Sequence, residues 1–407
     1  MGEKMRIAYF STEFPPLVYG GLGVYVDNIA RQLIDLDQKI AVFTWGNGKL
    51  PRHEIASGVE VFRETPVPMR DGMEIFLSQQ SRSWGEGLNF MMDLFSYNQL
   101  SASDLLLEGP FDLAVAHDWL GLVGGMAVKK AGVPLIFHVH GLEAGRSDCP
   151  NAQLVELEKM GAETANLVIT VSEAMKRELV DLGGDPEKIR VCYHGVDAAF
   201  FDPDRADPKR LAQMRRKLGF AEDDIVVLFM GRLEPVKGVL QLISSLAKVR
   251  AEHPQVKLLI VGKGSLESLA RSEAERQGGI SLVTDFLGPE DKFYTYALAD
   301  LCVFPSLYEP FGIVALEAAA MGKAAVVGAA GTSGLAEIVQ NPATERPTGV
   351  HVNARDPDDI AWGINLALQN MRQLKSWGRN ARQRVLDNFT WQNAAEQTLQ
   401  IYREVAG

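Results

Sequence analysis

Short runs of apolar residues alternate with longer segments of helical periodicity along almost the whole chain. The runs are rich in Val, Ile and Leu, which is typical of strands buried on both faces of a parallel sheet. They predict strands at Arg6–Phe10, Ile40–Thr44, Leu113–Ala116, Pro134–Val139, Leu167–Val171, Ile225–Met230, Val256–Val261, Ile280–Thr284, Leu301–Phe304 and Ala324–Val327. Helical patterns separate most of these runs, notably at Val24–Leu36, Leu154–Glu163, Val239–Glu252 and Leu266–Gln277. The alternation predicts an α/β fold built on doubly wound parallel sheets.

The predicted strands are too many for one sheet, so we expect two Rossmann-like domains. The turn-rich segment Ala198–Lys209 lies between two strand–helix series and is the best linker. We therefore predict a first domain over residues 1–200 and a second over residues 201–390. From Asp356 onward the chain has a helical, strand-free pattern with a break near Asp387–Asn388. Two such domains facing each other place a ligand cleft between the carboxyl ends of their sheets.

Composition narrows the class of protein. The 407 residues are 46% apolar and 23% charged, as in a soluble globular protein with ample core. A net charge of −11 argues against a general binder of nucleic acid or membrane surfaces. Three scattered cysteines (Cys149, Cys192 and Cys302) show no metal-ligand spacing and cannot form a disulfide framework. With no apolar run long enough to span a bilayer, we expect a cytoplasmic protein without a membrane anchor.

Two carboxylates flank a Pro-Phe-Gly turn after the predicted strand Leu301–Phe304. Glu309 lies on the strand-to-helix loop and Glu317 about two turns into the helix, on nearly the same side. Gly312 and Ile313 lie near the helix N-terminus, whose free amides can hold an anion. Carboxylates for hydroxyls and amides for phosphates suit a nucleotide sugar, whereas the plainer interpretation is a capped helix with solvated acids.

Glycines occur in two further strand-to-helix loops. Gly20-Gly21-Leu22-Gly23 allows close approach of the backbone to a phosphate at a helix N-terminus. It is not a dinucleotide fingerprint, because Val26 stands where the third glycine would be, so a nicotinamide cofactor is disfavoured. The pair Gly262 and Gly264 is half of such a fingerprint, and it either passes close to a nucleotide or forms a tight turn.

Charged residues and histidines come directly after several other predicted strands, where they could contact a ligand in the cleft. Arg232 and Lys237 project from one loop and can neutralise a diphosphate, arginine as a fork and lysine as a point charge. Asp118 and His140 follow successive strands and can reach a sugar in the cleft. His138 and His140 share one side of a strand, but no third zinc ligand has recognisable spacing.

The two Asp-x-Asp patterns and an aromatic segment each allow both a structural and a functional interpretation. Asp202-Pro203-Asp204 and Asp356-Pro357-Asp358 match a metal-binding Asp-x-Asp pattern, but both lie in proline-rich connectors, and we interpret them as turns and helix caps. No metal or cofactor is expected. The aromatic residues of Trp84–Tyr97 either stack an acceptor sugar or form the core of a helix.

These motifs, in this order, resemble those of glycosyltransferase family four, the retaining group that includes the glycogen and starch synthases. The resemblance covers nearly the whole chain and rests on Gly231-Arg232…Lys237-Gly238, Glu309-Pro310-Phe311-Gly312…Glu317, Gly20-Gly21-Leu22-Gly23, His117-Asp118-Trp119 and His140. It implies a GT-B fold, with two Rossmann-like domains facing across a cleft and a final helix, within residues 391–407, that crosses back onto the first domain.

The resemblance implies a leaving-group site in the second domain. Arg232 and Lys237 would bind the donor diphosphate and stabilise the departing nucleotide. The amides of Gly312 and Ile313, in the segment that includes Phe311, would add to that stabilisation.

It also implies contacts to the rest of the donor. Glu317 would hold the ribose hydroxyls, and Glu309 would contact the donor sugar near the reacting carbon. Asp118 and His140 would bind the donor sugar from the first domain. The backbone at Gly21 and Gly23 would approach the phosphates and the acceptor.

The implied reaction moves glucose from ADP- or UDP-glucose to a carbohydrate acceptor, foremost an α-1,4-glucan, without a metal ion. Bacterial ADP-glucose-dependent synthases carry lysine two places before the Gly-Gly pair, whereas this chain has Val18. That departure leaves archaeal-like glucan synthases and α-maltose-1-phosphate synthases open. The motifs are also compatible with a lipid or small-molecule acceptor, with a nucleotide-sugar 2-epimerase on the same fold and with a non-catalytic binder.

Overall fold

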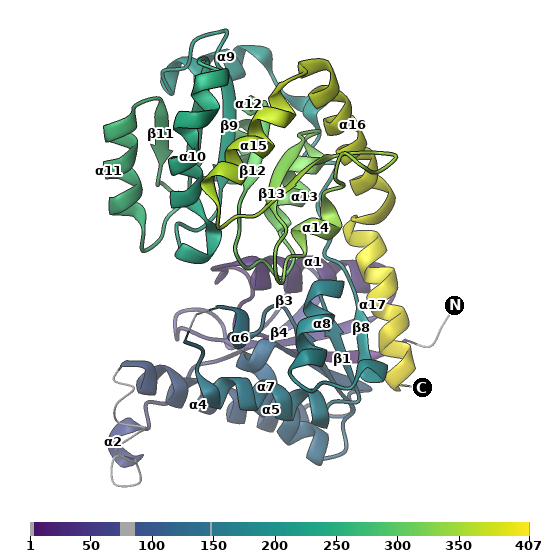
Figure 1. Cartoon of the computed structure of the whole chain (residues 1–407). Coiled ribbons are helices and arrows are strands. Elements are labelled where there is room, and N and C mark those ends of the chain that lie inside the picture. The colour runs from purple at the N-terminus through teal and green to yellow at the C-terminus, as the bar shows by residue number, and fades with distance from the viewer. Residues whose placement is uncertain (1–3, 74–85, 147–148, 407) are drawn as a thin grey trace.

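The computed structural model describes residues 4–73, 86–146 and 149–406, and it contains two sheets covered by helices, one above the other in Figure 1. The first sheet has eight strands in the order β3-β4-β2-β1-β5-β6-β7-β8, and the second has six in the order β11-β10-β9-β12-β13-β14. All pairs are parallel except β3 with β4. The predicted GT-B architecture is confirmed.

The first sheet forms the lower unit of Figure 1. Its strands are β1 (Arg6–Phe10), β2 (Lys39–Trp45), β3 (His53–Ala56), β4 (Val59–Glu64), β5 (Leu113–His117), β6 (Leu135–Val139), β7 (Leu167–Thr170) and β8 (Ile189–Val191). Its helices are α1 (Gly21–Asp35), α2 (Arg70–Met73), α4 (Glu86–Leu107), α5 (Asp118–Lys130), α6 (Glu143–Arg146), α7 (Ala152–Thr164) and α8 (Glu173–Asp181). Every residue of β5, β6 and β7 is buried, which explains their continuous apolar runs.

The second sheet forms the upper unit. Its strands are β9 (Ile225–Met230), β10 (Val256–Val261), β11 (Ile280–Val283), β12 (Leu301–Phe304), β13 (Ala325–Gly328) and β14 (Gly349–Val352). The helices that follow β8 in the chain are α9 (Pro208–Lys217), α10 (Val239–Glu252), α11 (Glu267–Gln277), α12 (Pro289–Leu298), α13 (Ile313–Ala320), α14 (Leu335–Ile338), α15 (Pro357–Leu368), α16 (Met371–Asn388) and α17 (Trp391–Ala406). One apolar cluster packs α10 and α15 against one face of this sheet, and another packs α12, α13 and α16 against the opposite face.

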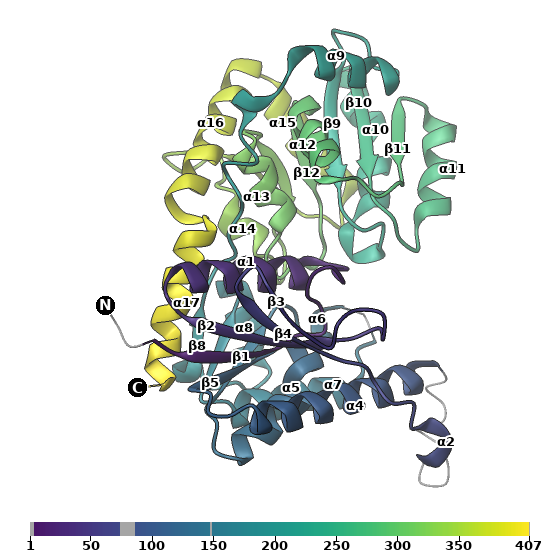
Figure 2. The same ribbon diagram turned by 180° about the vertical axis from the view of Figure 1, so that it is seen from behind.

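The last helix returns to the first sheet. Helix α17 lies alongside α1 in Figures 1 and 2, and its apolar side chains join the core on the face of the first sheet that α1 covers. The hydroxyls of Tyr402 and Tyr9 are 3.0 Å apart. The two chain segments that connect the units run side by side, because Val196 bridges to Thr390 and its N–H donates to the Phe389 carbonyl at 2.9 Å. The predicted crossing of the C-terminal helix is confirmed.

Every strand predicted from the sequence is present, but β3, β4, β8 and β14 were missed. β8 has only three residues, and β14 (Gly-Val-His-Val) contains a glycine and a histidine that interrupt its apolar run. β3 and β4 form an edge hairpin in which charged residues interrupt the apolar ones. Its turn has positive φ at both Ser57 and Gly58, and the Ser-Gly pair was the signal that could have identified it.

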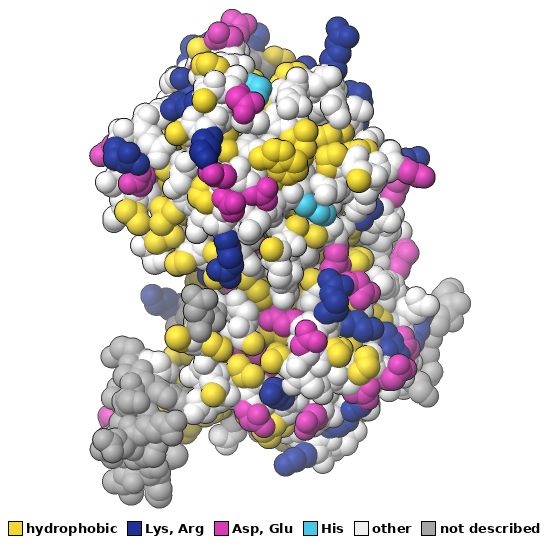
Figure 3. All heavy atoms as spheres, viewed as in Figure 1, with side chains coloured by type: hydrophobic (Ala, Val, Ile, Leu, Met, Phe, Trp, Pro, Cys, Tyr) yellow, Lys and Arg dark blue, Asp and Glu magenta, His cyan; other side chains and the backbone are white. Residues whose placement is uncertain are grey.

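Aspartates begin helices where the sequence contained Asp-x-Asp patterns. The Asp356 carboxylate accepts from the Asp358 N–H at 2.9 Å and caps α15, and Asp202 caps a short 3-10 turn in the same way. The interpretation as caps is confirmed. None of the helices in the described ranges combines the length and apolar character needed to cross a bilayer. Acidic and basic side chains are interspersed over the described part of the face shown in Figure 3.

Candidate active site

Loops at the carboxyl ends of the two sheets meet between the units. An added Cβ on Gly21 would lie 3.3 Å from Ile313 Cδ1, so the first glycine loop touches the N-terminal end of α13. Tyr308, from the second unit, accepts from the Leu142 N–H at 3.1 Å and fills the space where a Cβ on Gly145 would be. The structure therefore brings together motifs that are far apart in the sequence, as a cleft between strand ends requires.

The loop after β9 carries the predicted phosphate-binding cations. Lys237 lies 2.5 Å from a Glu309 carboxylate oxygen, which also accepts from the Ser306 hydroxyl at 3.3 Å. Gly238 follows with φ +68, and a Cβ there would meet the Pro305 carbonyl at 2.0 Å. Only glycine fits this approach, which holds the Lys237 loop against the loop after β12. Arg232 is exposed at the start of the same loop.

The N-terminus of α13 is formed by a glycine with φ +112. A Cβ on Gly312 would lie 2.4 Å from Leu335 Cδ2, so this position excludes larger residues. Phe311 is 2% exposed and packs on Tyr193 and His194, with ring centroids 5.8 and 5.1 Å apart. Its ring is therefore part of the core, and only its backbone could reach a nucleotide.

Glu317 is 6% exposed and has two partners on α12. It forms an ion pair with Lys292 and accepts from the Tyr296 hydroxyl at 2.8 Å. These two contacts fix the position of the Glu317 carboxylate against α12.

The second glycine pair packs on the Arg232 loop. A Cβ on Gly262 would lie 1.8 Å from the Gly231 carbonyl, and one on Gly264 would lie 2.4 Å from the Leu233 carbonyl. The Leu233 N–H donates to the Lys263 carbonyl at 2.8 Å. This close backbone packing accounts for both glycines whether or not a nucleotide lies near them.

A carboxylate holds the first glycine loop in shape. The Glu13 side chain accepts backbone N–H groups from Tyr19, Gly20 and Gly23 at 2.9, 2.9 and 3.3 Å. Glu13 was not among the site residues expected from the sequence, although an acid before a glycine-rich helix start was a usable signal. Part of the anion site predicted at α1 is thus occupied by this side chain, while Gly21 lies against Ile313 on the other unit.

Asp118 is a strained, buried acid at the start of α5. It has φ +54, accepts the His140 N–H at 2.7 Å and lies 3.3 Å from Arg146. Burial raises the pKa of the Asp118 carboxyl, and Arg146 opposes that rise. Strain of this kind persists where surrounding contacts enforce it and is common at functional sites. Arg146, which the sequence did not identify, is therefore part of the arrangement that positions Asp118.

His140 belongs to a cluster with His117, His138 and His194. His117 Nδ1 lies 3.0 Å from His140 Nε2, and His140 Nδ1 lies 3.3 Å from His194 Nε2. Burial lowers the pKa of His117 and of His194 to about 3 and lowers the pKa of His138 and His140 well below the usual value, so the rings are neutral at pH 7. His140 is thus a neutral, half-buried ring whose two nitrogens both face other histidines.

His117 is also the third nitrogen ligand that the sequence did not reveal. Ligand atoms of His117, His138 and His140 lie within 4.8 Å of one another and could hold a metal ion. The His138 and His140 rings, however, are stacked at 4.3 Å with 11° between their planes. Parallel rings direct their lone pairs side by side rather than toward one point, which suits packing better than tetrahedral coordination, although both ring nitrogens of the buried His138 have no hydrogen-bond partner among the described residues.

Both halves of the chain match known family models. Residues 19–200 match "Glycosyltransferase Family 4", and residues 212–384 match "Glycosyl transferases group 1". The chain is 31% identical to an uncharacterized glycosyltransferase of Methanocaldococcus jannaschii, with 98% of each chain covered. It is also 31% identical to a glycogen synthase of Mycobacterium tuberculosis and to a D-inositol 3-phosphate glycosyltransferase of Catenulispora acidiphila, covering 98% of this chain and 94% of each relative.

Solved structures share the fold at lower identity. A sucrose-phosphate synthase from Thermosynechococcus elongatus superposes with a TM-score of 0.76 at 23% identity, covering 98% of this chain and 99% of that one. The catalytic domain of starch synthase IV from Arabidopsis thaliana, bound to ADP and acarbose, superposes with a TM-score of 0.78 at 16% identity, covering 99% of this chain and 100% of that one. From its sequence relatives and its architecture, this chain belongs to glycosyltransferase family four and is a transferase with the GT-B fold.

Proposed function

We propose that this glycosyltransferase moves glucose, with retention of configuration, from ADP- or UDP-glucose to a carbohydrate acceptor, an α-1,4-glucan. The observation that carries the proposal is the meeting of Lys237 with Glu309 at 2.5 Å, beside the N-terminus of α13. A cation and helix-terminal amides suit a diphosphate, and an adjacent carboxylate suits the hydroxyls of the attached sugar. The binding and catalytic roles of these residues are part of this proposal.

In the proposed reaction the bond between the anomeric carbon and the diphosphate oxygen breaks, and its electron pair leaves with the oxygen. Arg232, Lys237 and the amides of Gly312 and Ile313 stabilise the charge that develops there. The acceptor hydroxyl forms the new bond on the same face of the sugar, and its proton passes to the departing phosphate oxygen. The two cationic side chains supply the positive charge that a metal ion supplies in other transferases.

Asp118, His140 and Glu309 hold the donor sugar during this step. Glu309 lies against Lys237, so a diphosphate on Lys237 brings the first sugar next to the Glu309 carboxylate. His140 lies on the other unit, and because its two ring nitrogens face His117 and His194, a sugar hydroxyl would replace one of these partners. The donor sugar therefore contacts residues of both units, so binding of the donor is coupled to closure of the cleft.

The relatives support a glucan as the acceptor, and they also suggest the main alternative acceptor. A 31% identical relative is a glycogen synthase, and a structural neighbour is a starch synthase bound to ADP and acarbose. An equally similar relative is a D-inositol 3-phosphate glycosyltransferase, which favours a phosphorylated acceptor as the second candidate. Synthesis of maltose 1-phosphate belongs to this second class.

A panel of donors and acceptors tests the proposal. ADP-, UDP- and GDP-sugars are each incubated with glycogen, maltose, glucose 1-phosphate, inositol phosphate or no acceptor, and release of nucleoside diphosphate is measured. We expect release with ADP- or UDP-glucose only when glycogen or maltose is present. Release that requires a phosphorylated acceptor would replace the glucan assignment, and conversion of the donor sugar without any acceptor would indicate an epimerase.

The proposed ribose contact gives a separate prediction. Glu317→Ala is expected to weaken binding of the nucleoside diphosphate about tenfold, because a fixed acceptor is lost. Turnover at saturating donor should change much less, since Glu317 is remote from the reacting carbon. Calorimetric titration with ADP and UDP measures the effect, with Glu273→Ala on the surface of α11 as the control. An unchanged dissociation constant would remove the ribose assignment.

A further inference from the structure

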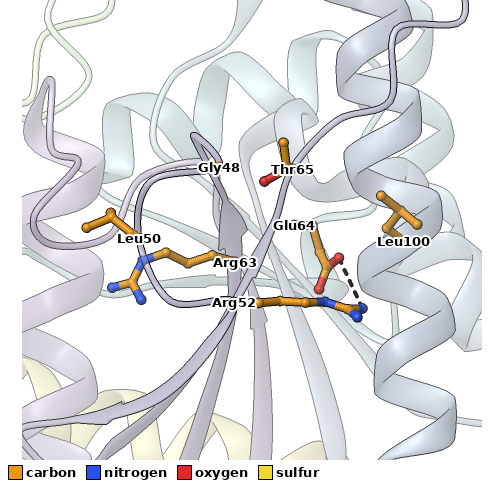
Figure 4. Close-up of a pocket in the computed structure, with 7 residues that line it drawn as sticks. All are labelled: Gly48, Leu50, Arg52, Arg63, Glu64, Thr65 and Leu100. Carbon is orange, nitrogen blue, oxygen red and sulfur yellow. Dashed lines mark ion pairs between the residues drawn. The ribbon is translucent and has the colours of Figure 1, made fainter.

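A cavity lies in the first unit, apart from the Lys237 and His140 loops. It has a volume of about 370 Å³ and is lined by Arg52, Arg63, Glu64 and Thr65, with Leu50 and Leu100 as apolar walls (Figure 4). Glu64 is the last residue of β4 and pairs in register with Trp45, the last residue of β2. The cavity is thus at the carboxyl ends of two neighbouring strands.

This position places the cavity on the same edge of the sheet as the candidate active site. Parallel strands end at one edge, and the strand order there is β4-β2-β1-β5. Asp118 follows β5, two strand spacings from β2, or about 10 Å away. Arg63 also donates to the Pro15 carbonyl at 2.9 Å, on the loop that carries Glu13 and the first glycines. The cavity therefore neighbours the cleft but does not overlap it.

Buried polar groups line the cavity without full partners. Arg63 and Glu64 are each 2% exposed, and Arg63 Nε and Glu64 Oε1 have no hydrogen-bond partner among the described residues. Such groups are costly unless a ligand or water satisfies them. Burial, and next the neighbouring Asp104, raise the pKa of Glu64 to about 7, so this carboxyl can both donate and accept near neutral pH.

The charges disfavour a phosphorylated ligand. Arg63 lies 2.7 Å from Glu54, and Arg52 lies 2.6 Å from Asp104 and 3.6 Å from Glu64. Three carboxyl groups (Glu54, Glu64 and Asp104) thus lie against two guanidinium groups, so acids outnumber cations around the cavity. A neutral ligand with many hydroxyls can use these donors and acceptors without disturbing the ion pairs.

An aromatic surface adjoins the polar groups. The half-buried Trp45 ring stacks on Phe90 and Tyr97 of α4, with centroids 5.9 and 5.8 Å apart. Phe90 is 46% exposed. Trp45 and Glu64 are register partners on adjacent parallel strands and so share one face of the sheet. Aromatic rings beside hydroxyl-binding side chains suit a sugar, which has an apolar C–H face and polar edges.

We propose that this cavity binds a distal unit of a neutral, chain-like carbohydrate acceptor, and so favours oligosaccharides over single sugars. The inference rests on the proposed transfer to a glucan and adds where the chain runs. A monosaccharide acceptor bound beside the donor sugar cannot also reach the cavity at the ends of β2 and β4. An oligosaccharide can occupy the donor cleft with one end and the cavity with another unit. Occupation of the cavity would stabilise long acceptors only.

The test uses Thr65→Trp, which fills the cavity from its exposed rim, and Thr344→Trp, on an exposed loop of the second unit, as the matched control. Calorimetric titration with maltoheptaose, without donor, is expected to show binding about tenfold weaker in Thr65→Trp and unchanged in Thr344→Trp. Glu64→Leu keeps a side chain of similar size but removes the groups that donate and accept, and it should also weaken maltoheptaose binding.

Kinetics separate this inference from the proposed function. Thr65→Trp should raise the KM for maltoheptaose and leave the KM for maltose and for the donor unchanged. Equal effects on maltose and maltoheptaose, or normal maltoheptaose binding in both cavity variants, would overturn the inference. A wild-type protein that binds maltoheptaose through this cavity but transfers no glucose to it would overturn the proposed function and leave the binding site standing.

Discussion

Lys237→Ala is expected to lower kcat by about two to three orders of magnitude, the loss typical of removing one preorganised group that stabilises transition-state charge. The structure gives the reason: Lys237 is held in the loop after β9 by the close approach of Gly238 to Pro305, and it faces Glu309. Arg232→Ala should have an effect of the same kind. Initial rates of nucleoside diphosphate release at saturating donor measure both.

The control is Lys248→Ala, because Lys248 pairs with Asp358 on the surface and lies outside the cleft. Thermal unfolding of each variant separates catalysis from stability, since Lys237→Ala leaves the nearly buried Glu309 without its cation. Normal turnover in folded Lys237→Ala and Arg232→Ala variants would remove the assignment of this loop to the diphosphate.

Gly312→Ala is expected to destabilise the protein by about 2–4 kcal/mol and to abolish tight nucleotide binding. Part of the cost is strain, since φ is +112, and part is overpacking, since the new Cβ would lie 2.4 Å from Leu335 Cδ2. Any relief of that clash moves the N-terminus of α13 and the amides proposed to hold phosphate. Urea unfolding and calorimetric titration with ADP or UDP measure the two effects.

Gly132→Ala is the matched control. Gly132 has φ +102, but no atom lies within 4 Å of its Cβ position, so only backbone strain of about 1–2 kcal/mol is expected. Similar losses of stability in both variants would show that the contact with Leu335 is unimportant. Normal nucleotide affinity in Gly312→Ala would argue against a phosphate site at α13.

The central strands and the long helices could be predicted because burial leaves a local signature. A strand such as β6 is buried on both faces, so its five residues form an unbroken apolar run. The hairpin at the sheet edge lacks this signature, because β4, second from the edge, contains Glu60, Arg63 and Glu64 among its apolar residues. The hairpin it forms was missed, and with it the cavity that it lines.

The residues of the candidate site likewise fall into those that the sequence could predict and those that it could not. Lys237 and Glu309 could be selected because each follows a predicted strand beside glycines or a helix start, and strand ends converge in this fold. Arg146, His117 and Tyr308 gain their importance from contacts between distant parts of the chain, which no local pattern encodes. Phe90 and Phe95 are exposed on α4 whereas Tyr97 is core, and Trp84 lies outside the described residues.

The most direct test follows the anomeric carbon of the donor sugar. ADP- or UDP-glucose labelled with ¹³C at the anomeric carbon is incubated with maltoheptaose, and the product is examined by NMR while nucleoside diphosphate release is measured. The proposed function predicts a new α-linked glucose at the chain end, nucleoside diphosphate released in equal amount, and loss of both in Lys237→Ala. A β-linked product, or label found only in free or epimerised sugar, would contradict retaining transfer of glucose to a glucan.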